Sequence, residues 1–182
     1  MNALARASKI KLIIFDVDGV LTDGKLIFSA DGELFKSFHA QDGLGISLLH
    51  KAGIKTAIIT GRTSDIVKFR SKELNITDVY QGAKNKVNAF EELKEKYALA
   101  LDEIAYVGDD LIDLPIMIKV GLACAVHNAV MDVKTRSHYI SEAAGGNGAV
   151  REISELILKA QDKWDDIVLS YLQLKPIEGI QQ

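Results

Sequence analysis

Short apolar runs alternate with longer amphipathic stretches along most of the chain. Five runs have the length and residue types of buried strands: Ile10–Asp16, Lys55–Thr60, Asp78–Tyr80, Ile104–Val107 and Leu122–Ala125. Four stretches between them have helical periodicity: Asp42–Ala52, Ser64–Glu73, Asn85–Tyr97 and Asp113–Val120. This alternation predicts an α/β fold, a Rossmann-like doubly wound parallel sheet that is covered by helices on both faces.

One segment interrupts the alternation directly after the first predicted strand. Residues 25–38 contain two apolar stretches, Lys25–Phe28 and Leu34–Phe38, on either side of the turn signal Asp31-Gly32. This pattern predicts a β-hairpin insertion that projects over the C-terminal edge of the sheet. Because an isolated hairpin has little stability, its apolar side chains should pack either within the chain or against other subunits.

The C-terminal part of the chain predicts one more helix, from about Ala149 to Leu172, with a break near Asp162. Residues 174–182, which include Pro176, have the composition of a mobile tail. No repeat, low-complexity block or change of pattern divides the chain, so the sequence predicts a single domain over residues 1–182.

Composition narrows the class of protein. The chain has 182 residues, of which 48% are hydrophobic and 26% are charged, as in ordinary globular domains with a substantial core. Its net charge of −3 argues against a general binder of nucleic acids. The one cysteine, Cys124, cannot form an internal disulfide. No stretch resembles a membrane span or the core of a signal peptide, so we expect a cytoplasmic protein.

Polar residues follow four of the predicted strands at the point where each strand ends. They are Asp16 and Asp18, then Thr60-Gly61-Arg62, then Lys84 and Lys86, and finally Gly108-Asp109-Asp110 with Asp113. Each group has a simpler reading as a turn, a helix cap or a solvated side chain. Because the carboxyl ends of parallel strands meet at one edge of a sheet, the joint pattern favours a site for Mg²⁺ and a phosphoryl group.

The order and spacing of these residues resemble the haloacid dehalogenase superfamily of phosphotransferases. Its four motifs correspond to Asp16-x-Asp18, to Thr60, to Lys86, and to Gly108-Asp109-Asp110 with Asp113. The resemblance covers the chain from Lys11 to about Ile153. It implies the fold of that superfamily and a phosphatase that transfers the phosphoryl group to the enzyme before hydrolysis.

The resemblance also implies a role for each matching residue. Asp16 corresponds to the nucleophile, and Asp18 to the general acid that later activates water. Thr60 and Lys86 correspond to residues that hold phosphoryl oxygens. Mg²⁺ would bind to the carboxylate of Asp16, the backbone carbonyl of Asp18 and Asp109. Asp110 and Asp113 would support this metal site.

The chain has little room for the large cap domain that covers many such sites. The stretch from Gly24 to Asp42 is too short for a cap, and a predicted helix and strand fill the stretch from Arg62 to Lys86. A capless enzyme has an exposed site, which either accepts macromolecules or is closed by neighbouring subunits.

Longer matches favour closure by neighbouring subunits. Four segments resemble the 3-deoxy-D-manno-octulosonate 8-phosphate phosphatases: Asp16–Gly24, His39–Gly43, Thr60–Arg62 and Gly145–Glu152. That family implies a Mg²⁺-dependent homotetramer of bacterial lipopolysaccharide synthesis whose substrate is a small sugar-acid phosphate. It also implies that the hairpins assemble around the tetramer axis and that the C-terminal tail can reach an adjacent active site.

Substrate contacts in that family correspond to Asp18, His39, Ala40, Gln41, Asp42, Gly43, Ser47, Arg62, Arg70 and Lys86. Arginine suits a sugar acid because a guanidinium group can bind a carboxylate or a phosphate through two hydrogen bonds. Three alternatives remain open: a phosphatase for a nine-carbon sugar acid 9-phosphate, a non-catalytic oligomerisation module and a protein phosphatase. The intact motif set argues against a module without catalysis, and no strongly charged docking stretch favours a protein substrate.

Overall fold

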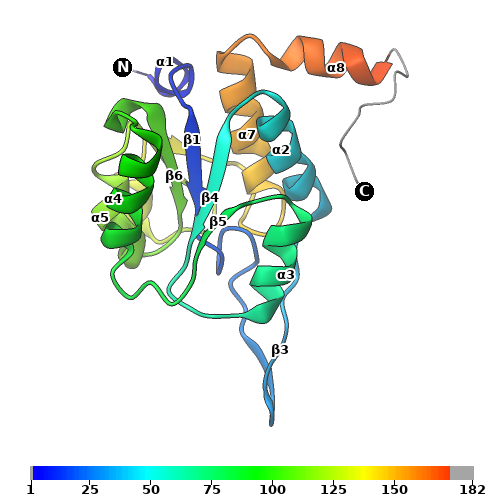
Figure 1. Cartoon of the computed structure of the whole chain (residues 1–182), viewed down its shortest axis with the longest axis vertical. Helices are drawn as coiled ribbons and strands as arrows, with labels where there is room; N and C mark the ends of the chain where they lie inside the picture. Colours follow the sequence, from blue (N-terminus) through cyan, green and yellow to red (C-terminus); the bar gives the residue numbers. More distant parts are fainter. Residues whose placement is uncertain (1, 173–182) are drawn as a thin grey trace.

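The computed structural model describes residues 2–172 and confirms the α/β architecture (Figure 1). Its six-stranded parallel sheet has the order β5-β4-β1-β6-β7-β8. The strands are β1 (Leu12–Phe15), β4 (Lys55–Ile59), β5 (Asp78–Tyr80), β6 (Ile104–Gly108), β7 (Leu122–Ala125) and β8 (Tyr139–Ile140). The first five match the predicted strands. β8 was missed because a strand of two residues is too short to show a hydrophobic period.

Helices cover both faces of the sheet (Figure 1). One layer contains α2 (Ala40–Lys51), α3 (Asp65–Glu73) and α7 (Ala149–Ala160), and the other contains α4 (Lys86–Tyr97) and α5 (Leu114–Met117). Shorter elements complete the described chain: α1 (Ala3–Ala7), α6 (Met131–Lys134), α8 (Trp164–Leu172), and 3₁₀ turns at Leu101–Glu103 and Leu111–Asp113.

The two central strands explain why the apolar runs have no polar alternation. Every residue of β1 and β6 is buried, because helices pack on both faces of the sheet. Parallel pairing places Phe15 opposite Val107 and Ile58, so these three strands end level with one another. The residues that follow them therefore meet at one edge of the sheet.

One predicted helix is shorter in the structure, and another has the break that was expected. The helix expected over Asp113–Val120 is only α5, preceded by a 3₁₀ turn, because the chain turns toward β7 and the N–H of Gly121 donates to the carbonyl of Leu101. The C-terminal helix is broken as expected. Asp162 has a left-handed φ of 55° between α7 and α8.

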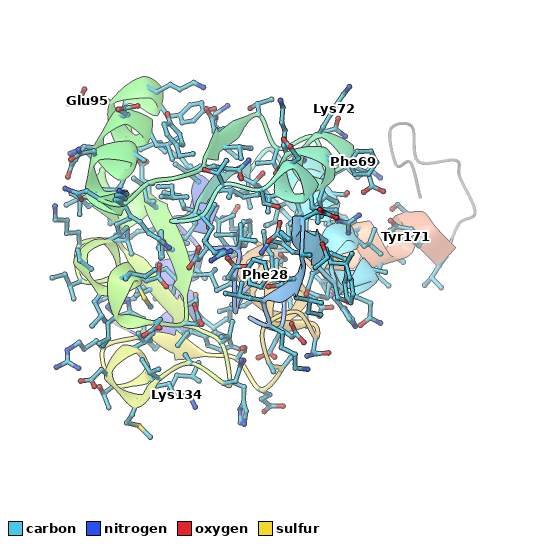
Figure 2. All side chains as sticks on the ribbon, turned by 90° about the horizontal axis from the view of Figure 1, so that it is seen from below. Phe28, Phe69, Lys72, Glu95, Lys134 and Tyr171 are labelled. Carbon is cyan, nitrogen blue, oxygen red and sulfur yellow. The ribbon has the colours of Figure 1, made fainter. Side chains whose placement is uncertain are left out.

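The insertion after β1 is an antiparallel hairpin of β2 (Ile27–Ser29) and β3 (Gly32–Phe35). Its turn is Ala30-Asp31, one residue earlier than predicted, because Gly32 at φ +124° already pairs with Ser29. The hairpin projects from the C-terminal end of the sheet, opposite the end that carries α8 (Figure 1). Viewed from that end, Phe28 lies near the middle of the molecule (Figure 2).

Within residues 2–172, this hairpin is the only insertion between β1 and α2, as expected for a capless protein. No helix in that part of the chain is long and apolar enough to cross a bilayer. The predicted tail at residues 174–182 lies outside the described residues.

Candidate active site

The polar strand ends meet in one pocket of about 250 Å³ at the C-terminal edge of the sheet. β1 leads into Asp16 and Asp18, β4 into Thr60 and β6 into Asp109. The pocket is lined by Asp16, Asp18, Gly24, Leu26, Thr60, Gly61, Arg62, Asp109, Asp110 and Ile112. The structure thus brings together residues that are separated by more than ninety positions in the sequence, as the motif pattern predicts.

Asp16 is held at the end of β1 with little freedom to move. Its N–H continues the strand ladder by donating to the carbonyl of Val107 at 3.1 Å, and its Oδ1 accepts the N–H of Val17 at 2.7 Å. Its Oδ2 lies 2.8 Å from Nζ of Lys86. Burial, reinforced by the nearby Asp113, raises the pKa of Asp16 to about 6 although Lys86 acts in the opposite direction.

Lys86, the first residue of α4, is buried between two carboxylates. Its Nζ lies 2.8 Å from Oδ1 of Asp113 as well as 2.8 Å from Asp16, and its side chain is only 3% exposed. Burial lowers the pKa of Lys86, but the two carboxylates outweigh this effect and raise the pKa above its ordinary value. Lys86 therefore places a fixed positive charge beside Asp16.

Asp113 organises the loop that follows β6. Its Oδ1 accepts hydrogen bonds from Lys86 and from the hydroxyl of Tyr106, which lies 2.7 Å away. Its Oδ2 accepts the backbone N–H groups of Asp109 at 3.0 Å and Asp110 at 3.3 Å. Both oxygens of Asp113 are thus engaged within the protein, and the residue is fully buried, which fits a supporting role. Asp16 and Asp109, in contrast, line the pocket, where a ligand can reach them.

The acidic cluster has the donor set of a site for a hard divalent cation. Asp16, Asp109 and Asp113 each place a carboxylate oxygen within 4.8 Å of the others. Oδ1 of Asp109 is buried and has no hydrogen-bond partner among the described residues. Burial, together with Asp113 and Asp16, raises the pKa of Asp109 to about 7. Crowded carboxylates with an unpaired buried oxygen fit Mg²⁺, which prefers oxygen ligands.

Backbone packing brings Asp109 close to the loop after β1. Gly19 has φ +94°, and a Cβ atom on it would lie 2.0 Å from Oδ2 of Asp109. Gly145 packs on the other side of this loop, where a Cβ would lie 1.6 Å from the carbonyl oxygen of Gly19. The glycine-rich segment 145–148 therefore supports the loop that carries Asp18.

Asp18 faces two cations. Its Oδ1 lies 2.5 Å from Nζ of Lys36, and its Oδ2 lies 3.7 Å from Nε of Arg62. Arg62 is partly exposed, and its guanidinium carbon lies 5.6 Å from the centre of the Phe28 ring. The hairpin thus contributes Phe28 and Lys36 to the surroundings of the site. Lys36 was not predicted from the sequence, because it lies at the end of the hairpin and belongs to none of the recognised motifs.

Two of the predicted substrate contacts lie in a second groove. Phe38, Ala40, Ile66, Phe69, Arg70 and Glu73 line a hollow of about 330 Å³ that shares no residue with the first pocket. Arg70 bonds to Glu73 at 2.8 Å, and its guanidinium carbon lies 5.7 Å from the centre of the Phe38 ring. Within the described chain, Ala40 and Arg70 are therefore not among the residues that line the Asp16 pocket.

The segment from His39 to Gly43 forms the start of α2. Its Asp42 is buried, and its carboxylate accepts the backbone N–H of Arg151 at 2.8 Å and of Gly148 at 3.3 Å, which caps α7. Ser47 donates to the carbonyl of Gly43 at 3.1 Å. These side-chain contacts are internal to the protein, so the carboxylate of Asp42 anchors the segment.

The other two side chains of this segment, His39 and Gln41, are less constrained. Gln41 is exposed, whereas Nδ1 of His39 is buried without a hydrogen-bond partner among the described residues. A substrate contact by either of them stays a prediction, as it does for Gly43 and Ser47.

Comparison with known proteins places this geometry in a family. The model of the haloacid dehalogenase-like hydrolases matches residues 63–153. The 3-deoxy-D-manno-octulosonate 8-phosphate phosphatase KdsC of Escherichia coli is 48% identical over 165 residues, which cover 91% of this chain and 88% of that protein.

Solved structures give the same result. The 3-deoxy-D-manno-octulosonate 8-phosphate phosphatase of Moraxella catarrhalis, in complex with magnesium ion, phosphate ion and KDO, matches with a TM-score of 0.90 and 43% identity, covering 92% of this chain and 97% of that one. The cobalt-bound form of the Haemophilus influenzae phosphatase matches with a TM-score of 0.88 and 40% identity, covering 92% and 99% of the two chains. The chain therefore belongs to the haloacid dehalogenase-like hydrolases, and the three relatives named above, which match about nine-tenths of its length, are octulosonate 8-phosphate phosphatases.

Proposed function

We propose that this protein is a Mg²⁺-dependent phosphatase that removes phosphate from 3-deoxy-D-manno-octulosonate 8-phosphate, as a step of lipopolysaccharide biosynthesis in the cytoplasm. One observation carries the proposal. Asp16 lies against the buried Lys86 and within reach of Asp109, in a pocket that also contains Asp18, Thr60 and Arg62. Similarity to named phosphatases over nine-tenths of the chain supports the choice of substrate.

The first step transfers the phosphoryl group to the protein. A carboxylate oxygen of Asp16 attacks phosphorus, and the bond from phosphorus to the ester oxygen breaks. The carboxyl proton of Asp18 moves to that ester oxygen, so the sugar acid leaves as an alcohol. Lys86 and the hydroxyl of Thr60 stabilise the charge on the transferring oxygens, an effect that is strong in a buried site.

The second step hydrolyses the aspartyl phosphate on Asp16. The Asp18 carboxylate takes a proton from water, whose oxygen attacks phosphorus. The bond from phosphorus to the Asp16 oxygen breaks, which releases inorganic phosphate and restores the Asp16 carboxylate. The Asp16 carboxylate, the Asp18 backbone carbonyl and Asp109 are the groups that would hold Mg²⁺. The bound cation would supply positive charge that lets an anionic nucleophile approach an anionic phosphate.

An arginine at the rim of the pocket supports the proposed preference for sugar acids. Arg62 lines the pocket, and its side chain is 44% exposed, so its guanidinium is accessible to a substrate carboxylate. Arg70, Ser47 and the segment 39–43 remain proposed substrate contacts. Because Arg70 and Ala40 line a separate groove of the same protomer, their contribution requires a neighbouring subunit or a rearranged loop.

A homotetramer with sites near the subunit interfaces would supply that neighbour. Leu34 and Phe35 are adjacent in β3, so their side chains point to opposite faces of the hairpin. Yet they are 56% and 48% exposed, which means that both faces of the hairpin are uncovered in the protomer. Phe28 of the same hairpin is 55% exposed, and Phe69 of α3 is 72% exposed.

A substrate panel tests the proposed function. We would measure Mg²⁺-dependent phosphate release from the octulosonate 8-phosphate, from a nine-carbon sugar acid 9-phosphate and from simple hexose phosphates. The proposal expects kcat/KM to be highest for the octulosonate. A higher kcat/KM for the nine-carbon acid 9-phosphate would mean that this compound, and not the octulosonate 8-phosphate, is the substrate. Failure to release phosphate from any compound would favour an oligomerisation module.

A further inference from the structure

Lys36 has a buried side chain at the end of a hairpin whose apolar residues are largely exposed. It follows β3, whose Leu34 and Phe35 are about half exposed, but its own side chain is only 1% exposed. Its Nζ lies 2.5 Å from Oδ1 of Asp18 and 3.0 Å from Oε1 of Glu33. A buried ammonium group is costly unless it is paired, so the charge of Glu33 and the acceptor oxygen Oδ1 of Asp18 keep Lys36 in place.

Glu33 is itself anchored to the body of the molecule. Its Oε2 accepts the hydroxyl proton of Ser64, the residue that caps the N-terminus of α3. The backbone N–H of Ser64 donates to Oε1 of Gln81 at 2.7 Å. Contacts thus run without interruption from the loop after β1, through the hairpin, to the loops after β4 and β5. Lys36 is the link that joins Asp18 to this network.

The contact with Lys36 makes the two oxygens of Asp18 unequal. Oδ1 is engaged with the ammonium group, whereas Oδ2 lies 3.7 Å from Nε of Arg62, beyond hydrogen-bonding distance. Asp18 also lines the pocket that contains Asp16. Fixing Oδ1 therefore leaves Oδ2 as the oxygen that can carry a proton to a bound phosphate ester.

We propose that Lys36 is a positioning residue that orients the carboxyl group of Asp18 for proton transfer to the leaving oxygen. The inference rests on the proposed function, in which Asp18 is the proton donor. As the phosphorus–oxygen bond of the ester breaks and the bond to Asp16 forms, the proton on Oδ2 of Asp18 moves to the ester oxygen. Lys36 keeps its own protons and contacts no reacting atom.

A merely structural role for Lys36 would have a different signature. If Lys36 only held the hairpin in place, its loss would slow the reaction of every phosphate ester alike. If it orients a proton donor, its loss should matter only where the leaving group needs a proton. An alkoxide needs protonation as it leaves, whereas p-nitrophenolate is a weak base that leaves without it. The comparison of alkyl and aryl esters therefore separates the two roles.

The experiment compares wild type with Lys36→Met on a sugar phosphate and on p-nitrophenyl phosphate. The measured quantity is kcat/KM, which covers the steps up to the phosphorylation of Asp16. We expect a fall of about 10- to 100-fold for the sugar phosphate and a fall of less than about threefold for the aryl ester. Lys36→Arg, which keeps a charged donor, should recover most of the lost rate. Lys25→Met is the matched control, because Lys25 lies next to the hairpin but pairs with Asp23 and is 77% exposed.

Equal losses on the two esters, or no loss on either, would overturn the inference. Rates are divided by the folded fraction from circular dichroism, so partial unfolding is not mistaken for lost catalysis. Glu33→Gln offers a second variant, because it weakens the anchor of Lys36 without removing its ammonium group. It should give the same substrate pattern with a smaller loss. If wild type hydrolysed neither ester, the proposed function would fail before the role of Lys36 was at issue.

Discussion

Nζ of Lys86 lies 2.8 Å from Oδ2 of Asp16, and this ion pair is almost entirely closed to solvent. Asp113 completes the arrangement, because its Oδ1 lies 2.8 Å from the same ammonium group. The charge that would stabilise the transferring phosphoryl group is therefore also the charge that allows two carboxylates to be buried. We therefore expect stability and catalysis to depend on the same side chain.

Lys86→Met, alone and combined with a second substitution, should separate the effect of Lys86 on stability from its effect on catalysis. The single variant leaves Asp16 and Asp113 without their cation, so we expect the free energy of unfolding to fall by about 3 to 5 kcal/mol. Adding Asp113→Asn removes one of the unpaired charges and should recover part of this loss without recovering activity. Urea unfolding without metal measures the stability. A single variant within about 1 kcal/mol of wild type would contradict the account.

The acidic cluster predicts how pH affects the metal-free protein. Burial raises the pKa of Asp109 to about 7 in the folded state, well above the value near 4 of an unfolded chain. The folded state therefore binds the proton more tightly, and this stabilising contribution is lost as the pH rises through 7. Asp109→Asn imitates the protonated group. In EDTA it should melt about 3 to 8 °C above wild type at pH 8, and the difference should shrink toward pH 5.5.

With Mg²⁺ at pH 8, wild type should instead melt at a higher temperature than Asp109→Asn. Binding to the folded state raises the melting temperature of wild type, whereas the variant lacks one of the proposed ligands and should gain much less. Differential scanning fluorimetry with and without Mg²⁺ provides both comparisons. A melting difference in EDTA that does not change between pH 5.5 and 8 would show that Asp109 does not titrate as described.

Gly19→Ala tests the close approach of the loop after β1 to Asp109. A Cβ at this position would lie 2.0 Å from Oδ2 of Asp109, so the carboxylate must shift, and we expect Mg²⁺ affinity to fall by about tenfold or more. Gly53→Ala is a matched control, because Gly53 also has a positive φ, of +79°, but nothing lies within 4 Å of the added atom. It should share the backbone strain and keep the Mg²⁺ affinity. Equal metal affinities in the two variants, measured by calorimetry, would argue against this role of Gly19.

The exposed hairpin predicts which substitutions disrupt assembly. Leu34→Glu places a charge on a face that we propose to be buried between subunits, so light scattering should show a shift from tetramer toward smaller species. Ile118→Glu is the control. Ile118 is 67% exposed and directly follows α5, in the helical layer that also contains α4, so it lies outside the hairpin. A wild-type protein that is monomeric and fully active would remove the argument for shared sites.

Most of the fold and the centre of the site could be predicted from the sequence because both depend on local patterns. Continuous apolar runs mark strands that are covered on both faces, and parallel pairing brings their ends together. Asp16, Thr60 and Asp109 reach one pocket for this reason.

The remaining features depend on contacts between distant segments. Asp42 caps a helix whose first turn lies more than 100 residues away, and nothing near Asp42 in the sequence indicates this partner. Lys36 approaches Asp18 only because the hairpin folds back over the loop after β1. The two-residue strand β8 forms by pairing with the free edge of β7, and its own sequence is too short to show a hydrophobic pattern.

The central claim is that Asp16 forms a bond to phosphorus, and Asp16→Asn tests it most directly. We would measure phosphate release from 3-deoxy-D-manno-octulosonate 8-phosphate with saturating Mg²⁺. Asp102→Asn is the control, because Asp102 precedes β6 at the opposite end of the sheet and its side chain is 57% exposed. The account predicts that Asp16→Asn lowers the rate by about 10³-fold or more while the control stays near wild type. Release by Asp16→Asn within about tenfold of wild type would contradict it.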